Sequence, residues 1–235
     1  MQAEIYDLER NHTWIVTDLP PGKTPIGCKW VFRIKYRSDE IIERHKARLV
    51  VLGIRQVEGI DFTKTFAPVA KMTSVRVFLS VAAIKGWHLH QMDVHNAFMH
   101  GDLNEEVYMK LPPSFPTTHS GQVCKLQKSL YGLSQAPRNW LSKLVHSLSI
   151  FGFHQSKADY SLFSLTQSNT TLHVLEYVDD LIIAEDDLSA IDRFKRSLRS
   201  CIHMKDLGIR KYFLGIEIAR NPKGLFLSQK KYTLI

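Results

Sequence analysis

The stretch LHVLEYVDDLIIAED, residues 172–186, places two adjacent carboxylates, Asp179 and Asp180, between two apolar runs. Because side chains alternate along a strand and both runs are rich in Leu, Ile and Val, each run predicts a largely buried β-strand. The two acids then lie in the turn of a hairpin. An ordinary exposed turn is one interpretation, since Asp is a favoured turn residue. A basic partner or a divalent metal ion is the alternative, because neighbouring carboxylates repel each other.

The composition indicates a folded domain with a polyanionic partner. The 235 residues are 44% hydrophobic, which is enough for a substantial core. Lys and Arg number 31 against 23 Asp and Glu, and this net charge of +8 favours a polyanion without identifying it. The longest apolar run, residues 77–84, is too short to span a bilayer, and the first residues lack the apolar region of a secretory signal. We therefore expect an intracellular protein with no membrane partner.

The hydrophobic periodicity predicts an α+β fold. Residues 28–36 and 41–52 predict a long basic hairpin around a polar turn. A helix over 73–86 should begin at a Thr or Ser cap, and a helix over 188–200 should turn Lys195 outward with its other basic residues. These elements, together with a strand over 87–94, a helix over 136–152 and a hairpin over 212–229, predict an antiparallel sheet with helices on one face.

A third acid can join the pair in the turn. Asp93 ends the predicted strand 87–94, on the face that it shares with Gln91. Two metal ions about 3.5 to 4 Å apart need shared carboxylates from separate elements. An Asp at a strand end that faces an Asp pair in a hairpin turn meets this need. Such a site supports a Mg²⁺-dependent in-line displacement, in which a hydroxyl group attacks a triphosphate.

Several blocks in fixed order resemble one family. They are QMDVHNAFMHGDLNEEVYM (91–109), VCKLQKSLYGLSQAPRNW (123–140) and YVDD (177–180), flanked by NHTWIVTDLPPGKTPIGCKWVFRIK (11–35), RHKARLVVLG (44–53) and KDLGIRKYFLGIEI (205–218). Together they resemble the reverse transcriptase domain of copia-type LTR retrotransposon Pol polyproteins. YVDD alone is weak evidence, but the blocks in register cover nearly the whole chain.

The resemblance implies a right-hand polymerase with fingers and palm. Residues 1–86 would form a fingers-like part, and 87–220 the palm, with a fingers segment re-entering around 104–135. Residues 221–235 would be the truncated start of the connection region. The implied activity is RNA-directed DNA synthesis from deoxynucleoside triphosphates on a primed RNA or DNA template, with Mg²⁺ or alternatively Mn²⁺. The implied context is a polyprotein with integrase and RNase H, within cytoplasmic virus-like particles.

The resemblance also implies roles for single residues. Asp93 would bridge both metal ions, Asp179 would be a second direct ligand, and Asp180 would complete the acidic cluster. Phe98 would exclude a 2′-hydroxyl from the nucleotide site, although a plain core position is the alternative. Further nucleotide contacts are implied for Lys46, Arg48, Tyr131 and Gly132, and primer or template contacts for Tyr177, Gln135, Leu214 and Gly215.

The chain departs from the family pattern at positions that affect activity. Leu52 and Ser134 replace frequent lysines, and Glu185 replaces a frequent glycine. Glu176 shares a strand face with Val174 that should pack against helices, where an unpaired polar group costs about 1 to 3 kcal/mol. The alternative function is therefore an inactive or domesticated nucleic-acid-binding remnant. Another palm-type enzyme, such as an RNA polymerase, is disfavoured because it predicts a small residue in place of Phe98.

Overall fold

The chain folds into two compact units. A computed structural model describes it except for residues 37–40, 168–169, 209–211, 222–223 and 230–235. The first unit comprises residues 1–67 and 97–143, and the second comprises 68–96 and 144–235. The predicted division at 86/87 differs from this one, because helix α2 (Met72–Lys85) packs its apolar residues into the sheet of the second unit.

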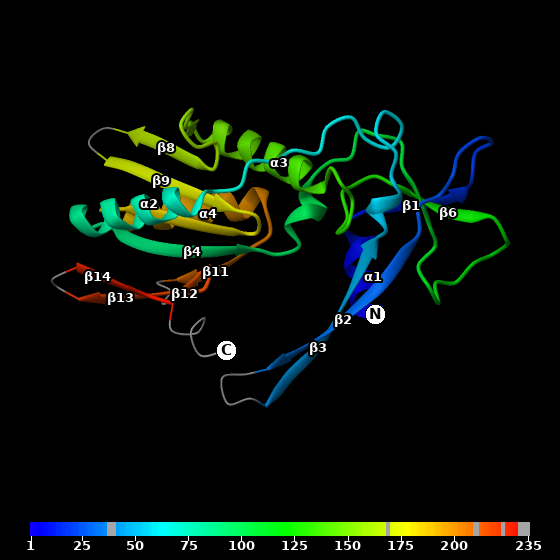
Figure 1. The fold of residues 1–235 in the computed structure, drawn as a ribbon, viewed down its shortest axis with the longest axis horizontal. Helices are drawn as coiled ribbons and strands as arrows, with labels where there is room; N and C mark the ends of the chain where they lie inside the picture. Colours follow the sequence, from blue (N-terminus) through cyan, green and yellow to red (C-terminus); the bar gives the residue numbers. More distant parts are fainter. Residues whose placement is uncertain (37–40, 168–169, 209–211, 222–223, 230–235) are drawn as a thin grey trace. The chain divides into compact units, whose positions relative to one another are not determined.

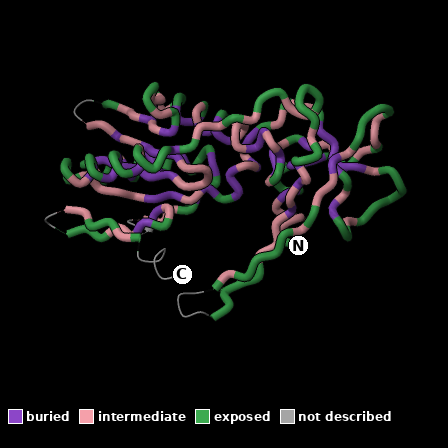
Figure 2. Tube along the Cα trace, viewed as in Figure 1, coloured by how far each residue is buried: buried purple, intermediate pink, exposed green. Residues whose placement is uncertain are grey.

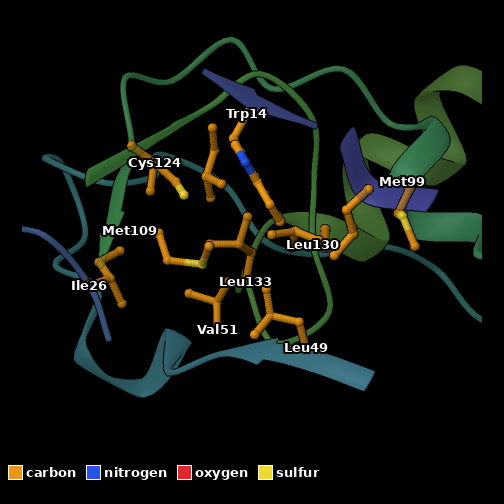
Figure 3. Close-up of a cluster of buried hydrophobic side chains, with 13 residues drawn as sticks. Trp14, Ile26, Leu49, Val51, Met99, Met109, Cys124, Leu130 and Leu133 are labelled. Carbon is orange, nitrogen blue, oxygen red and sulfur yellow. The ribbon is translucent and has the colours of Figure 1, made fainter. Parts of the chain in front are cut away.

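The first unit combines a small antiparallel sheet with a separate hairpin. Its elements are α1 (Gln2–Arg10), β1 (Trp14–Asp18), β2 (Cys28–Tyr36), β3 (Ile42–Val51), η1 (Gly53–Arg55), η2 (Ala97–His100), β5 (Tyr108–Lys110) and β6 (Gln122–Leu126). The sheet has the order β1-β6-β5, and β2 pairs with β3. Figure 3 shows its core, in which Leu49 and Val51 of β3 meet Met109 and Leu130. The base of the hairpin is therefore anchored in this core.

The β2–β3 hairpin has one basic and one apolar face. Val31 pairs with Arg48, Arg33 with Lys46 and Lys35 with Arg44, so these side chains share a face. The opposite face carries Trp30, Phe32, Ile34 and Tyr36 from β2. Figure 2 shows that most of the hairpin is exposed. The predicted basic hairpin is present, and its predicted polar turn lies outside the described residues.

The second unit is built on a six-stranded antiparallel sheet. Its further elements are β4 (His88–Val94), the C-terminal part of α3 (Ala136–Ile150), β7 (His154–Gln155), β8 (Leu162–Gln167), β9 (Thr170–Tyr177), β10 (Asp180–Glu185), α4 (Leu188–Cys201), β11 (Met204–Gly208), β12 (Tyr212–Phe213), β13 (Ile216–Asn221) and β14 (Gly224–Ser228). The strand order is β11-β4-β10-β9-β8-β7, and β12-β13-β14 form a second small sheet. Figure 1 labels β4, β8, β9 and β11 of the large sheet and all three strands of the small one. No helix in the described part of the chain is long and apolar enough to cross a membrane.

Helices cover both faces of the large sheet, so the prediction of helices on one face is wrong. Helix α2 packs on the face that carries Leu175 and Ile182. Helix α4 meets the opposite face, where Nζ of Lys195 lies 2.5 Å from Nδ1 of His90. Consecutive residues of the central strand β10, from Leu181 to Ala184, are all buried. Because consecutive side chains of a strand point to opposite faces, both faces of the sheet must be covered.

Lys195 corrects a second prediction. The helical pattern predicts it on the outward basic face of α4, but its side chain is only 5% exposed. It forms an ion pair with Asp206 of β11 at 3.1 Å and contacts His90 of β4. A buried cation needs such partners. Asp206 lies 11 residues further along the chain, and His90 lies 105 residues before Lys195.

Candidate active site

The acidic turn lies between two central strands of the second unit. Tyr177, the last residue of β9, pairs with Asp180, the first residue of β10, so Val178 and Asp179 form a two-residue turn. Val178 has φ 59°, a left-handed conformation that is strained for a β-branched residue. The backbone N–H of Val94 donates to the carbonyl of Asp179 at 2.7 Å. This hydrogen bond ties the turn to the end of β4.

The predicted third acid is the cross-strand neighbour of the pair. Asp93 of β4 lies directly opposite Asp180 of β10. Directly opposed residues of antiparallel strands point to the same face, with Cβ atoms about 5 Å apart. On the other side of β4, Lys205 of β11 pairs with Asp93. The register therefore sets two carboxylates and one cation in a row across three strands, with Asp179 beside them.

A side-chain hydrogen bond orients one of these carboxylates. Nε2 of Gln91 donates to Oδ1 of Asp180 at 2.7 Å. Gln91 precedes Asp93 by two residues and shares its strand face. The sequence predicts Gln91 on this face, but its role follows only from the structure. Its signal was the alternation that it shares with Asp93.

The donor chemistry of the acidic turn fits a hard divalent ion. Mg²⁺ prefers carboxylate oxygens and commonly uses one or two of them together with phosphate oxygens of the substrate. Asp93, Asp179 and Asp180 supply such oxygens, and Gln91 engages only Oδ1 of Asp180. Within the described ranges, no three His, Cys, Asp or Glu side chains come close enough together to hold a metal ion.

Glu176 is buried beneath the turn. Its side chain belongs to β9, is 3% exposed, and pairs in register with the fully buried Leu181. Burial raises its pKa to about 8, against the opposing effect of a hydrogen bond with the backbone of Val178. Its Oε2 has no hydrogen-bond partner among the described residues. The expectation that this strand face is packed is confirmed.

We expect Glu176→Val to raise the thermal midpoint more at pH 8 than at pH 5. The pKa of Glu176 rises from 4.5 to about 8 on folding, so its folded state favours the protonated carboxyl. Stability from this group is therefore complete below pH 4.5 and is lost as the pH rises towards 8, at up to about 1.4 kcal/mol per pH unit. Melting curves of both proteins at the two pH values measure it. An unchanged or lower midpoint of the variant at pH 8 would show that the ionised carboxylate is not destabilising.

A second group of predicted residues meets in the first unit. The guanidinium carbon of Arg48 lies 4.3 Å from the ring centroid of Tyr131. The ring of Phe98 lies edge-on to Tyr131, with 4.9 Å between centroids. Arg48 comes from β3, Phe98 from η2, and Tyr131 from the loop before α3. Three predicted nucleotide contacts from distant segments are thus in direct contact.

The basic face of the hairpin concentrates positive charge, with Glu4 as a nearby acid. Lys46 lies beside Arg48, Arg44 and Lys35, and its pKa is lowered, first by burial and then by these cations. A lysine whose charge is disfavoured in this way gains from a bound anion. This face therefore suits phosphate groups.

Gly132 is required where the predicted loop meets β3. Its φ is +93°, and an added Cβ would lie 2.1 Å from the carbonyl oxygen of Val51. The neighbouring backbone of Tyr131 accepts a hydrogen bond from the N–H of Val51 at 2.8 Å. The predicted close approach is thus made to the protein backbone of β3.

The predicted primer and template contacts occupy different environments. Leu214 and Gly215 form the two-residue turn between β12 and β13, with φ 49° and 78°, both positive as a type I′ turn requires. Tyr177 is half-buried against the apolar cluster that includes α2. The side chain of Gln135 is fully buried and bonded at both ends of its amide. A role for Gln135 towards primer or template therefore runs through the loop that it supports.

Comparison with known proteins assigns the family. A model described as reverse transcriptase (RNA-dependent DNA polymerase) matches residues 11–234. The chain therefore belongs to the reverse transcriptase family, and the predicted copia-type resemblance is confirmed.

The relatives are retrotransposon proteins. The chain is 44% identical over 236 residues to the retrovirus-related Pol polyprotein from transposon RE1 of Arabidopsis thaliana, covering 100% of this chain and 16% of that protein. It is 43% identical over 236 residues to the corresponding polyprotein from transposon TNT 1-94 of Nicotiana tabacum, covering 99% of this chain and 18% of that protein. The chain thus spans less than a fifth of the length of these two relatives.

Proposed function

We propose that this chain is the nucleotide-polymerising part of a copia-type reverse transcriptase, which extends a primer 3′-hydroxyl on an RNA or DNA template. The observation that carries the proposal is the register that sets Asp93 opposite Asp180, with Asp179 in the adjoining turn. Family membership supports the same activity. In this proposal the first unit contributes fingers and the second contributes palm, within a larger polyprotein that includes integrase and RNase H.

The proposed chemistry assigns a task to each residue of the acidic turn. Asp93 and Asp179 would hold two divalent ions, and Asp180 would add negative charge beside them. When bound, the ions supply an activated primer hydroxyl and neutralise the triphosphate leaving group. Gln91 fixes the orientation of the Asp180 carboxylate through its hydrogen bond. Val94 fixes the position of the turn through the Asp179 carbonyl.

The nucleotide would be bound by the residues of the first unit. Lys46 and Arg48 offer cations to the triphosphate from the basic hairpin face. The Tyr131 ring supports the Arg48 guanidinium from below, a contact worth about 0.5 to 2 kcal/mol. Phe98, held against Tyr131, would meet the sugar. Leu214 and Gly215, with Tyr177, would contact the primer and template from the second unit.

Primer extension tests this function. The purified chain is supplied with a homopolymer RNA template, a DNA primer, the complementary deoxynucleotide, and Mg²⁺ or Mn²⁺. The proposal expects divalent-ion-dependent extension. Extension that persists in excess chelator would contradict it.

We expect Phe98→Ala to admit ribonucleotides. Removing the ring removes the bulk that would meet a 2′-hydroxyl, while deoxynucleotide incorporation falls less. The measurement is the ratio of kcat/KM for a deoxynucleotide to that for the matching ribonucleotide. The matched control is Phe115→Ala, since Phe115 packs against the same core but contacts Trp14 instead of Tyr131. Equal discrimination in wild type and Phe98→Ala would return Phe98 to a core role.

A nucleic-acid-binding remnant is the second candidate function, and the basic hairpin face favours it. This candidate predicts salt-dependent binding of a primer-template without extension. We expect affinity to fall steeply between about 50 and 200 mM salt, because phosphate contacts release counterions. Arg33→Gln and Arg44→Gln should each reduce the salt slope by about one, whereas Arg196→Gln on α4 should leave it unchanged. Binding that is indifferent to salt would exclude a phosphate-binding role of the hairpin.

A further inference from the structure

One glutamine holds the loop that carries Tyr131. Oε1 of Gln56 accepts a hydrogen bond from the backbone N–H of Ser134 at 2.8 Å. Its Nε2 donates to Oε1 of Gln135 at 3.0 Å. Gln56 follows η1, directly after β3, while Ser134 and Gln135 belong to the loop before α3. A single side chain therefore joins two segments nearly 80 residues apart.

The bonding pattern requires an amide at position 56. Gln56 offers one acceptor and one donor, and each meets its complement in the loop. Gln135 is fully buried, and its own Nε2 donates to the carbonyl of Asp61 at 3.0 Å. The two amides therefore form a continuous chain of hydrogen bonds between loop and backbone. A carboxylate, a lysine or an apolar side chain at position 56 would break at least one link and leave a buried polar group unpaired.

The loop cannot shift without moving the aromatic group beside it. Gly132 packs on the end of β3, and the backbone of Tyr131 bonds to Val51. The Tyr131 ring then contacts both Arg48 and Phe98. Gln56 fixes the same loop two residues beyond Gly132. Val51 holds the backbone of Tyr131 itself, and Gln56 holds the backbone three residues further along, at Ser134. The position of Tyr131 therefore depends on both contacts.

We infer that Gln56 is a positioning residue for the nucleotide site: it sets the Tyr131 loop so that Tyr131, Arg48 and Phe98 keep their mutual geometry. This inference rests on the proposed function for its effect on the reaction. Its structural part, the fixing of the loop, stands apart from catalysis. Gln56 would act through the loop and would not touch the nucleotide.

The first measurement is amide hydrogen exchange of the full chain without substrates. In Gln56→Met, peptides covering residues 131–137 should exchange roughly tenfold faster, because the loop loses two hydrogen bonds. Peptides of the second unit should not change. Gln127→Met is the matched control, because Gln127 is an exposed glutamine of the same unit. Should Gln56→Met fail to fold, Gln56→Glu serves instead, since it keeps the acceptor for Ser134 and loses only the donor.

The second measurement is steady-state incorporation by the same proteins. Gln56→Met should raise the KM for the deoxynucleotide roughly tenfold and lower discrimination against the ribonucleotide, with a smaller change in kcat. A residue of purely structural importance would lower the amount of active protein and leave KM and discrimination unchanged.

The outcomes separate the two claims. Unchanged exchange at residues 131–137 in a folded variant overturns the inference whether or not the chain polymerises. Faster exchange with unchanged KM and discrimination overturns the link to the nucleotide. If wild type shows no incorporation, the proposed polymerase function fails, and so does any effect of Gln56 on the reaction, while exchange still decides whether Gln56 fixes the loop.

Discussion

We expect Asp93→Asn and Asp179→Asn each to reduce deoxynucleotide incorporation by roughly a thousandfold or more, about 4 kcal/mol of transition-state stabilisation. Each substitution removes a carboxylate that the proposed mechanism uses as a direct metal ligand. An amide keeps the shape of the side chain but not its charge. Asp180→Asn should cost less, because one of its oxygens already accepts a hydrogen bond from Gln91.

The comparison needs a control for general loss of charge. Asp192→Asn removes an exposed acid from α4 and should leave incorporation unchanged. Incorporation is measured on one template at saturating primer with each divalent ion in turn. Full activity in Asp179→Asn would contradict the assignment of the acidic turn.

Gly132→Ala should destabilise the first unit by more than about 3 kcal/mol, the second largest effect that we expect. The added methyl group would lie 2.1 Å from the carbonyl oxygen of Val51 and 2.8 Å from Cγ1 of Val50, at a φ of +93°. Backbone oxygen cannot move aside as a flexible side chain can. The loop must therefore move away from β3, and the contacts of Tyr131 with Arg48 and Phe98 are then lost.

Gly121→Ala isolates the effect of this contact. Gly121 has nearly the same φ, +97°, but an added Cβ there would meet nothing within 4 Å. Its substitution should cost only the backbone strain, about 1 to 2 kcal/mol. Denaturant unfolding of both variants measures the difference. Equal costs would show that the close approach of Gly132 to β3 is unimportant for stability.

The central hairpin could be predicted because its residues determine it locally. Residues 172–186 are dense in Leu, Ile and Val on both sides of the acids, and the structure places strands β9 and β10 there. Asp93 could be placed by alternation along its strand. The short strands β5 and β7 were not predicted, because a run of three or two residues forms a strand only when a partner strand pairs with it.

Other features depended on partners that the local pattern does not reveal. Lys195 has the helical spacing of a surface residue, but Asp206 and His90 make its burial favourable. Ser74 fits a helix cap by its type, yet Lys71 occupies the N-cap position and the Ser74 hydroxyl donates to Asp159. Gln56 gave no signal in the sequence because its partners lie about 80 positions away.

The most direct test of the central claim is the binding of Mn²⁺ by the chain with primer-template and a non-incorporable deoxynucleotide analogue, followed by electron paramagnetic resonance. The claim is that carboxylates near the end of β4 and in the β9–β10 turn hold divalent ions for DNA synthesis. It predicts bound Mn²⁺ in wild type and in Asp192→Asn, and loss of that bound Mn²⁺ in Asp93→Asn and Asp179→Asn. Equal binding of Mn²⁺ by wild type and Asp93→Asn would contradict it.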